Sequence, residues 1–275
     1  MVTFLFWNLD KRPLSDRVVR LARTHEVDVL ILAECAIDLP ELLKALNGSG
    51  GKPYSLPAGA SEKIQIMTRF PGPSLVEEFE DPIRGLTLRE LRIEGLSYIL
   101  LAAIHLPSRI NWNEKDYTLA STTIAQSITR TEDALGHRRT ILVGDLNMNP
   151  FDPGVVGAQG LNAVMTRQLA RRAERLVRDK SYRIFYNPMW GFFGDRTEGP
   201  AGSYYYRAAT PSNHFWNIYD QVLVRPGLMD ALEEVRILDS DGTDALLTRN
   251  GLPRRSSGSD HLPLLFRPNL RPETM

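Results

Sequence analysis

Short apolar runs of strand length recur along the whole 275-residue chain, and this recurrence restricts its fold more than any other feature. The run from 27 to 33 is apolar except for Asp28, which is typical of a strand buried on both faces. Some runs are joined by tight turns, as at Glu94-Gly95, and others are separated by segments with helical spacing. The predicted strands are Thr3–Trp7, Val27–Ala33, Lys63–Thr68, Leu86–Ile93, Tyr98–Ile104, Thr140–Val143, Tyr204–Arg207, Ile218–Val224, Glu234–Leu238 and Leu262–Phe266.

Helical patterns lie between several of these strands. Leu14, Val18, Leu21 and Ala22 recur at helical spacing, and the other predicted helices are Leu39–Leu46, Lys115–Leu135 and Leu161–Lys180. Residues 52–82 are rich in Pro and Gly, and only one strand is predicted there. The mixed connections predict an α+β fold with sheets in the middle and helices outside. Because no segment has the character of a linker, we expect one domain over residues 1–275.

Composition excludes several classes of protein. Lys and Arg number 33 and Asp and Glu also number 33, so a globally basic nucleic-acid binder is excluded, although a local charged patch is not. The single cysteine, Cys35, excludes a disulfide framework and a multi-cysteine metal site. The first residues lack a basic leader, and no run of about 18 apolar residues occurs. We therefore expect a soluble cytoplasmic protein without membrane insertion, and the sequence leaves its oligomeric state open.

Polar residues repeatedly follow or interrupt the predicted buried strands, where apolar residues would be expected. An isolated buried carboxylate costs several kcal/mol unless it is paired or bound to a metal. Carboxylate and amide oxygens are the ligands preferred by Mg²⁺ and Mn²⁺. These residues therefore predict a single cleft that holds a hard divalent cation. They are Asn8, Asp10, Glu34, His105, Asp145, Asn147, Asp220, Ser259, Asp260 and His261.

Each of these residues also has an ordinary structural interpretation when taken alone. Asn8 or Asp10 could cap the helix that Pro13 introduces, and Asp145 with Asn147 could form an Asx turn. Glu34 could pair with a surface arginine, His105 could be a core histidine, and Asp260 could belong to a turn. The order of the whole set is more specific than any one member.

In this order and spacing the sequence resembles the endonuclease/exonuclease/phosphatase superfamily, which contains pancreatic-type deoxyribonuclease and the exonuclease III-type abasic-site endonucleases. The Gly-Asp-x-Asn and Ser-Asp-His elements are its most specific motifs. One position departs from the pattern, because Ala33 stands where the family usually has Gln before the metal-binding Glu. The matching segments are Phe6-Trp7-Asn8-Leu9-Asp10, Asp28-Val29-Leu30-Ile31-Leu32-Ala33-Glu34, Ala103-Ile104-His105-Leu106, Val143-Gly144-Asp145-Leu146-Asn147, Tyr219-Asp220-Gln221-Val222-Leu223-Val224 and Ser259-Asp260-His261.

The resemblance implies a four-layer α/β sandwich with two central mixed β-sheets flanked by helices. It also implies a role for each matching residue. Glu34 would be the main ligand of Mg²⁺ or Mn²⁺, helped by Asp10, Asn8 or Asp260. His261 would contact the scissile phosphate, and Asp220 would orient that histidine. Asp145 would align or deprotonate the attacking water. Asn147 and His105 would contact the phosphate or the water.

The insert Phe151–Asn217, between the Gly-Asp-x-Asn motif and the segment that contains Asp220, suggests the substrate. Residues 165–183 carry seven cations against two acids, and at roughly 100° per residue four arginines, among them Arg171 and Arg175, fall within a sector of about 80°. If this segment is a helix, the arginine face could contact a nucleic-acid backbone or could simply be solvated. Arg109 and Trp112 follow the predicted strand that ends at Ile104 and could line the cleft or an exposed loop.

Aromatic residues crowd the following segment and could either stack on unpaired bases or cap the core. They are Tyr186, Trp190, Phe192, Phe193, Tyr204, Tyr205, Tyr206, Phe215 and Trp216. The predicted substrate-binding set is therefore Arg109, Trp112, Arg171, Arg175 and Trp216. The whole pattern predicts a metal-dependent nuclease acting on nucleic acid. A phosphoesterase for inositol phosphates or sphingomyelin, and a scaffold that has lost catalysis, are the alternatives.

Overall fold

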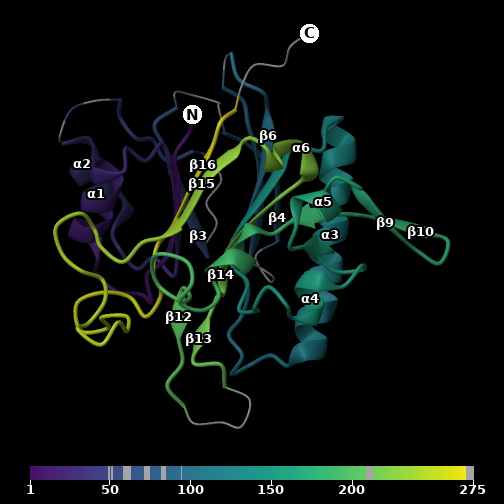
Figure 1. The fold of residues 1–275 in the computed structure, drawn as a ribbon. Helices are drawn as coiled ribbons and strands as arrows, with labels where there is room; N and C mark the ends of the chain where they lie inside the picture. The colour runs from purple at the N-terminus through teal and green to yellow at the C-terminus, as the bar shows by residue number, and fades with distance from the viewer. Residues whose placement is uncertain are drawn as a thin grey trace.

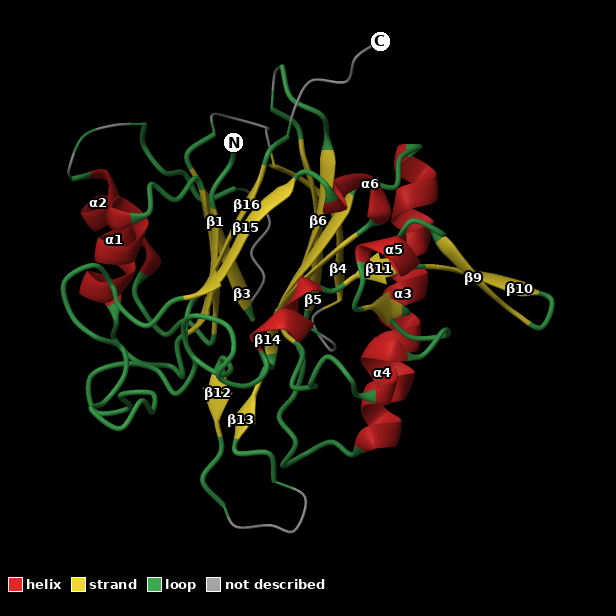
Figure 2. Ribbon diagram, in the orientation of Figure 1, coloured by secondary structure: helices red, strands yellow, loops and turns green. Residues whose placement is uncertain are grey.

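A computed structural model describes residues 1–48, 50, 52–57, 63–70, 75–81, 85–93, 95–208 and 213–270, with backbone alone for 75–81. Two β-sheets lie side by side in the middle of the molecule, and helices lie outside each of them (Figure 1). In Figure 2 the sheets, in yellow, separate α1 and α2 from the other helices, in red. The predicted fold, a four-layer sandwich of two mixed sheets and flanking helices, is confirmed.

The first sheet has five strands in the order β15-β16-β1-β2-β3. β1 pairs parallel with β2 and antiparallel with β16. Helices α1 (Ser15–Thr24) and α2 (Leu39–Asn47) lie on its outer side (Figure 1). The strands are β1 Phe4–Asn8, β2 Val29–Ala33, β3 Ile64–Thr68, β15 Leu232–Ile237 and β16 Leu264–Pro268.

The second sheet has seven strands in the order β4-β5-β6-β7-β14-β11-β8, with β6 and β7 parallel. Four helices lie on its outer side (Figure 2): α3 Glu114–Leu135, α4 Pro153–Val156, α5 Arg167–Ala170 and α6 Pro226–Met229. The strands are β4 Leu75–Asp81, β5 Leu86–Leu91, β6 Ile99–His105, β7 Thr140–Asp145, β8 Ala163–Val164, β11 Phe185–Tyr186 and β14 Asp220–Val224.

Two hydrophobic cores separate the layers. Strand alternation directs Leu101 and Val143 toward the first sheet, where they join a core that includes Ile31. It directs Leu100 and Leu142 to the opposite face, where they pack in the core that also contains residues of α3. Each large aliphatic side chain that is fully buried contributes about 1.5 to 3 kcal/mol to this packing.

Local signals define the long helix α3. The Asn113 side chain accepts hydrogen bonds from the backbone N–H groups of Lys115 and Asp116, and the Asp116 side chain accepts one from the Asn113 N–H. This capping box fixes the start of α3, and Gly136, with φ of 73°, ends it in the left-handed region. The predicted helix over Lys115–Leu135 is therefore correct to within one residue.

The predicted helix Leu161–Lys180 is wrong. This segment instead contains β8, the short helix α5 and most of a hairpin formed by β9 (Glu174–Val177) and β10 (Lys180–Arg183), which projects beyond α3 (Figure 1). Ala173 and Arg178 adopt left-handed φ values of 61° and 52°, so the helical backbone cannot continue through them. Leu176, which the opposite face of such a helix would have packed inward, is 74% exposed.

Other differences between the predicted and observed elements are smaller. Strand β4 lies within residues 52–82, where only the strand corresponding to β3 was predicted. The Glu94-Gly95 turn falls partly outside the described residues, because Glu94 is not among them. A second small hairpin pairs β12 (Tyr204–Tyr205) with β13 (Trp216–Asn217), and the 3₁₀ helix η2 covers Pro188–Phe192. Among the described residues, no helix combines the length and apolar character needed to cross a membrane.

Candidate active site

Topology brings the polar strand ends to one edge of the sandwich. The parallel strands β1 and β2 end at Asn8 and Ala33, and Glu34 follows directly. In the second sheet, parallel β6 and β7 end at His105 and Asp145, which are register partners. The antiparallel strand β14 begins at this edge, because its first residue, Asp220, pairs with Asp145.

A cleft of about 540 Å³ lies at this edge. It contains most of the residues predicted for catalysis and metal binding, while Asn8, His105 and Asp220 contact its lining from behind. The lining residues are Asp10, Glu34, Ser108, Arg109, Ile110, Asp145, Asn147, Tyr204, Tyr206, Tyr219, Asp260 and His261.

His261 and Asp220 form a buried dyad. Nδ1 of His261 lies 2.8 Å from Oδ2 of Asp220, and this contact directs Nε2 of the imidazole away from the aspartate. The Ser203 hydroxyl accepts a hydrogen bond from the Asp220 N–H, and the Tyr204 ring packs 4.7 Å from the imidazole. The Trp7 indole N–H donates to the His261 carbonyl. The histidine is therefore held on several sides.

The dyad carries a positive charge on its imidazole. Burial disfavours that charge, but Asp220, Asp145 and Asp260 outweigh burial and raise the pKa of His261 to about 10. Burial raises the pKa of the Asp220 carboxyl, and the neighbouring imidazole opposes that rise. A cationic imidazole beside a cleft is suited to an anionic ligand such as a phosphate group.

Asp145 is the most highly connected carboxylate of the site. Its Oδ2 accepts a hydrogen bond from Asn8 Nδ2 at 3.0 Å, and its Oδ1 accepts one from the Asn147 N–H at 2.9 Å. Nε2 of His261 and Nε2 of His105 lie 3.8 Å and 3.9 Å from Oδ2. The carboxylate is thus fixed between two amides and two imidazoles, with one edge facing the cleft.

Glu34 lies beside this group on the other sheet. Its Oε1 lies 3.3 Å from Nε2 of His105 and 3.5 Å from Nδ2 of Asn8. The hydrogen bond with His105 is the main reason that the pKa of Glu34 falls to about 2, and burial only partly opposes it. Its backbone has a φ of 46°, a left-handed conformation that is uncommon for Glu. Glu34 is therefore an ionised carboxylate held in a special backbone position.

Asp10 and Asp260 complete the acidic lining. Asp10 pairs with Arg12 at 3.4 Å, and Asp260 pairs with Arg255 at 3.4 Å. Both salt bridges involve arginines that are about half exposed and therefore neutralise the carboxylates only weakly. Burial raises the pKa of Asp260, with further positive and negative neighbours adding smaller effects.

The donor set fits a hard divalent cation. Four carboxylates line the cleft, and they are hard oxygen donors that match Mg²⁺ or Mn²⁺. One compact group, Asp145, Asp220 and His261, offers three atoms within 4.8 Å of one another. Within that group, however, Asp220 and His261 are hydrogen-bonded to each other, so we regard the open carboxylates around Glu34 as the better ligands.

Gly144 explains one residue of the Gly-Asp-x-Asn motif. Its φ is 151°, and a Cβ at this position would lie only 1.8 Å from the carbonyl oxygen of Ile104 on β6. Glycine therefore lets β6 and β7 approach closely just before Asp145. Asn147, at the other end of the motif, has a φ of 50° and donates from Nδ2 to the Leu106 carbonyl.

Four of the five predicted substrate-binding residues lie outside the cleft lining. Arg109 lines the cleft, with its Nε donating to the Asn147 carbonyl. Trp112 packs against Tyr117 in an adjoining hollow, and Trp216 packs edge-on against Tyr205. Arg171 lies 3.7 Å from Asp230, and Arg175 donates to the Val156 carbonyl. A substrate role for these four residues remains a prediction.

The lining residues Ser108, Ile110, Tyr204, Tyr206 and Tyr219 were not among the predicted site residues. Tyr204 and Tyr206 belong to an aromatic segment that was noted, but nothing in their sequence indicates which tyrosines face the cleft. Their pairing with residues near Trp216 decides this, because alternate residues of a hairpin strand point to opposite faces. Tyr219 stacks on Tyr204 with ring centroids 5.3 Å apart.

Two mixed sheets packed face to face and flanked by helices are the architecture of deoxyribonuclease I-like proteins. The model of the Endonuclease/Exonuclease/phosphatase family matches residues 5–261. The chain belongs to this family, whose members hydrolyse phosphoric esters. No curated relative matches the chain in sequence.

Solved structures with this fold match the chain over nearly its full length. The 3′ phosphatase NExo from Neisseria, bound to a product DNA hairpin, is 18% identical, with 98% of this chain and 99% of that chain covered and a TM-score of 0.55. TDP2 from D. rerio, complexed with a single strand DNA product, is 15% identical, with 96% and 97% covered and a TM-score of 0.55. An AP endonuclease from Archaeoglobus fulgidus is 12% identical, with 98% and 100% covered and a TM-score of 0.54. At these identities the likeness establishes the fold.

Proposed function

We propose that this protein is a Mg²⁺- or Mn²⁺-dependent nuclease that hydrolyses phosphodiester bonds of nucleic acid. The observation that carries the proposal is the position of the His261 imidazole, held by Asp220, in the same cleft as Glu34 and Asp145. An imidazolium beside several carboxylates provides both an anion contact and ligands for a cation. Two of the solved structures with this fold hold DNA products, which supports nucleic acid as the substrate class.

Each residue then has a defined task. Nε2 of His261 donates a hydrogen bond to a non-bridging oxygen of the scissile phosphate, with Asp220 holding the ring in place. Asp145 orients the attacking water and accepts its proton, since it is a fixed carboxylate at the cleft surface. Asn147 and His105 make further contacts with the phosphate or the water.

Glu34, with Asp10, Asn8 and Asp260, would hold the divalent cation. A bound Mg²⁺ or Mn²⁺ supplies Lewis acidity and lowers the pKa of water in its coordination shell. Asn8 bridges Glu34 and Asp145 through Nδ2, so it keeps the cation ligands and the water-orienting carboxylate in register.

Hydrolysis of bis(p-nitrophenyl) phosphate with Mg²⁺, Mn²⁺ or EDTA tests the chemistry. We expect metal-dependent turnover, reduced roughly 10²- to 10⁴-fold in Glu34→Ala and His261→Ala. Glu41→Ala and His214→Ala are matched controls, because both residues are exposed and lie outside the cleft lining. If the wild-type protein turned over no phosphoester with any metal, the proposal would be wrong and a non-catalytic scaffold would be favoured.

A substrate panel then tests the choice of nucleic acid. It contains plasmid, single-stranded DNA, RNA, abasic duplex and inositol phosphates, each with Mg²⁺, Mn²⁺ and EDTA. We expect cleavage of at least one nucleic acid at a higher kcat/KM than any inositol phosphate. Preferred hydrolysis of the inositol phosphates would instead identify a small-molecule phosphoesterase.

A further inference from the structure

Two side chains with large apolar surfaces lie at the mouth of the cleft and are largely exposed to solvent. Ile110 is 93% exposed, the highest value among the large hydrophobic residues that the structure describes, and Tyr206 is 44% exposed. Both line the cleft that contains His261 and Glu34. Single exposed apolar residues are common on protein surfaces, but two at the rim of one charged cleft indicate a ligand with an apolar surface.

Ile110 is presented by an anchored turn. The Asn111 N–H donates to the Ser108 carbonyl, which closes the turn around residues 108–111. The neighbouring Arg109 donates to the Asn147 carbonyl, pairs with Asp152 and lies over the Tyr219 ring. The backbone on which Ile110 stands is therefore tied to the loop that follows Asp145.

Tyr206 lies on the cleft side of the β12–β13 hairpin. Its N–H donates to the Phe215 carbonyl, and its own carbonyl accepts a hydrogen bond from Asn213 Nδ2. Tyr204, two residues earlier, packs against His261 and Tyr219 and is only partly exposed. The Tyr206 ring is the next aromatic surface along the strand, and much of it is open to a ligand.

We propose that Ile110 and Tyr206 hold an unpaired base next to the scissile phosphate, so that the substrate is a strand of DNA or RNA whose bases are free of a complement. This inference rests on the proposed nuclease function. A base presents a flat face to an aromatic ring whatever its identity, so stacking is tolerant of sequence. In a duplex that base must first be unpaired and unstacked, which costs a few kcal/mol.

Cleavage of a labelled strand, alone and annealed to its complement, tests this inference. We expect a higher kcat/KM on the single strand. Tyr206→Ala should lower that value roughly 5- to 100-fold, mainly through KM, and Ile110→Ser should lower it less. Tyr206→Phe should retain nearly wild-type kcat/KM because the ring remains. The kcat for the labelled strand should change little in these variants, because the proposed contact is with the base and not with the reacting atoms.

Two exposed aromatic residues outside the cleft lining provide matched controls. Phe215, on the same hairpin, is 47% exposed, and Tyr98, at the start of β6, is 46% exposed. Phe215→Ala and Tyr98→Ala should leave strand cleavage unchanged. Binding of the same fluorescent strand in EDTA, followed by anisotropy, should weaken in Tyr206→Ala and not in these controls.

The outcomes separate this inference from the proposed function. Equal or faster cleavage of the duplex, or unchanged strand cleavage and binding in Tyr206→Ala, would overturn the role of the base. A loss that fell on kcat rather than on KM for the labelled strand in Tyr206→Ala would also overturn it, because the residue would then support the chemistry itself. Absence of any phosphoester turnover in the wild-type protein would overturn both proposals.

Discussion

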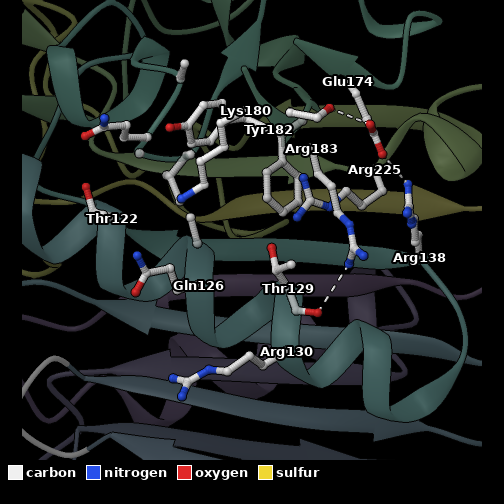
Figure 3. Close-up of a pocket in the computed structure, with 17 residues that line it drawn as sticks. Thr122, Gln126, Thr129, Arg130, Arg138, Glu174, Lys180, Tyr182, Arg183 and Arg225 are labelled. Carbon is white, nitrogen blue, oxygen red and sulfur yellow. Dashed lines mark hydrogen bonds and ion pairs between the residues drawn. The ribbon is translucent and has the colours of Figure 1, made fainter. Parts of the chain in front are cut away.

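Two hollows of this protein are rich in charged residues, and their charges are arranged in opposite ways. The cleft at the strand ends measures about 540 Å³, and the hollow between α3 and the β9–β10 hairpin measures about 670 Å³. In the hollow, Figure 3 shows Arg138 directed toward Glu174 and Arg183 directed toward Thr129. Several of the charged side chains that line this larger hollow are therefore already paired within the protein.

Glu132 on α3 pairs with Arg183 and Arg225, two of the arginines that line the hollow. Arg225 Nε and Arg183 Nη1 each lie 2.8 Å from one of its two carboxylate oxygens, and the Thr140 hydroxyl donates to it as well. Arg225 also packs over the Phe185 ring at 3.8 Å. Glu132 and Arg225 are both buried, and each carries the charge that compensates the other.

The cleft has the opposite balance. Glu34, Asp145, Asp220 and Asp260 meet two imidazoles, of which His261 is held in its charged form, and the lining arginine Arg109 is paired with Asp152. An excess of carboxylate, rather than the size of a hollow, therefore marks the site where we propose that a cation and a phosphate bind. The same substitution, Glu to Gln, should therefore have different effects in the two regions.

Glu132→Gln should have the largest effect on stability. Removing one charge from a buried pair leaves Arg225 uncompensated, which costs about 3 to 5 kcal/mol of unfolding free energy. Denaturant unfolding measures this loss, and bis(p-nitrophenyl) phosphate turnover per folded molecule should remain unchanged. A variant as stable as the wild type would mean that the two regions do not differ in the way proposed.

Glu34→Gln should have a large effect on activity and a small effect on stability. Loss of a main cation ligand should reduce kcat/KM by about 10²-fold or more, since a bound metal stabilises the transition state by several kcal/mol. The unfolding free energy should fall less than in Glu132→Gln, because Glu34 remains partly open to water and the Gln side chain can still accept the hydrogen bond from His105. Retention of full metal-dependent activity would contradict the assignment of Glu34.

Metal binding in the cleft should raise the unfolding free energy of the protein, and a substitution at the hollow should leave this effect unchanged. At ten times the dissociation constant, Mn²⁺ should raise the unfolding free energy by about 1.4 kcal/mol, because it binds the folded state. Calorimetry with and without EDTA measures this shift, which should disappear in Glu34→Gln and persist in Arg130→Gln at the hollow. An equal shift in Glu34→Gln would place the metal elsewhere.

A third charged cluster, around Asp241, should behave like the hollow but with a smaller effect. Burial alone would raise the pKa of Asp241, but the hydrogen bond from Arg20 and those from the backbone of Thr243 and Asp244 lower it. Because the folded pKa lies below the ordinary value, this stabilisation is complete at neutral pH. It is lost as the pH falls through and below that ordinary value.

The wild-type protein should thus lose about 1 kcal/mol more stability than Asp241→Asn between about pH 7 and about pH 3. Urea unfolding across that range in EDTA measures the difference. Asp244→Asn is the matched control, because Asp244 also contacts Arg20 but is exposed. Parallel pH curves for Asp241→Asn and the wild type would show that Asp241 is not a stabilising acid.

The sequence by itself determined most strands of the two sheets, the order of the motifs and the meeting of the polar residues in one cleft. Glu34, Asp145 and His261 each lie next to a buried apolar run. A polar side chain in such a position must be solvated or paired with another polar or charged group, and this can be recognised from its neighbours in the sequence. The long helix α3 was equally predictable, because its cap residues are neighbours in the chain.

Only the tertiary structure decided what the 161–183 segment and the tyrosines do. The arginine spacing there is compatible with a helix, but left-handed Ala173 and contacts with Glu132 on α3 hold it as a hairpin. The orientation of Tyr206 depends on the pairing of β12 with β13, and the pairing of His261 with Asp220 depends on segments 41 residues apart in the sequence. Such long-range pairing is set by the packing of both sheets, and no periodicity within one segment contains it.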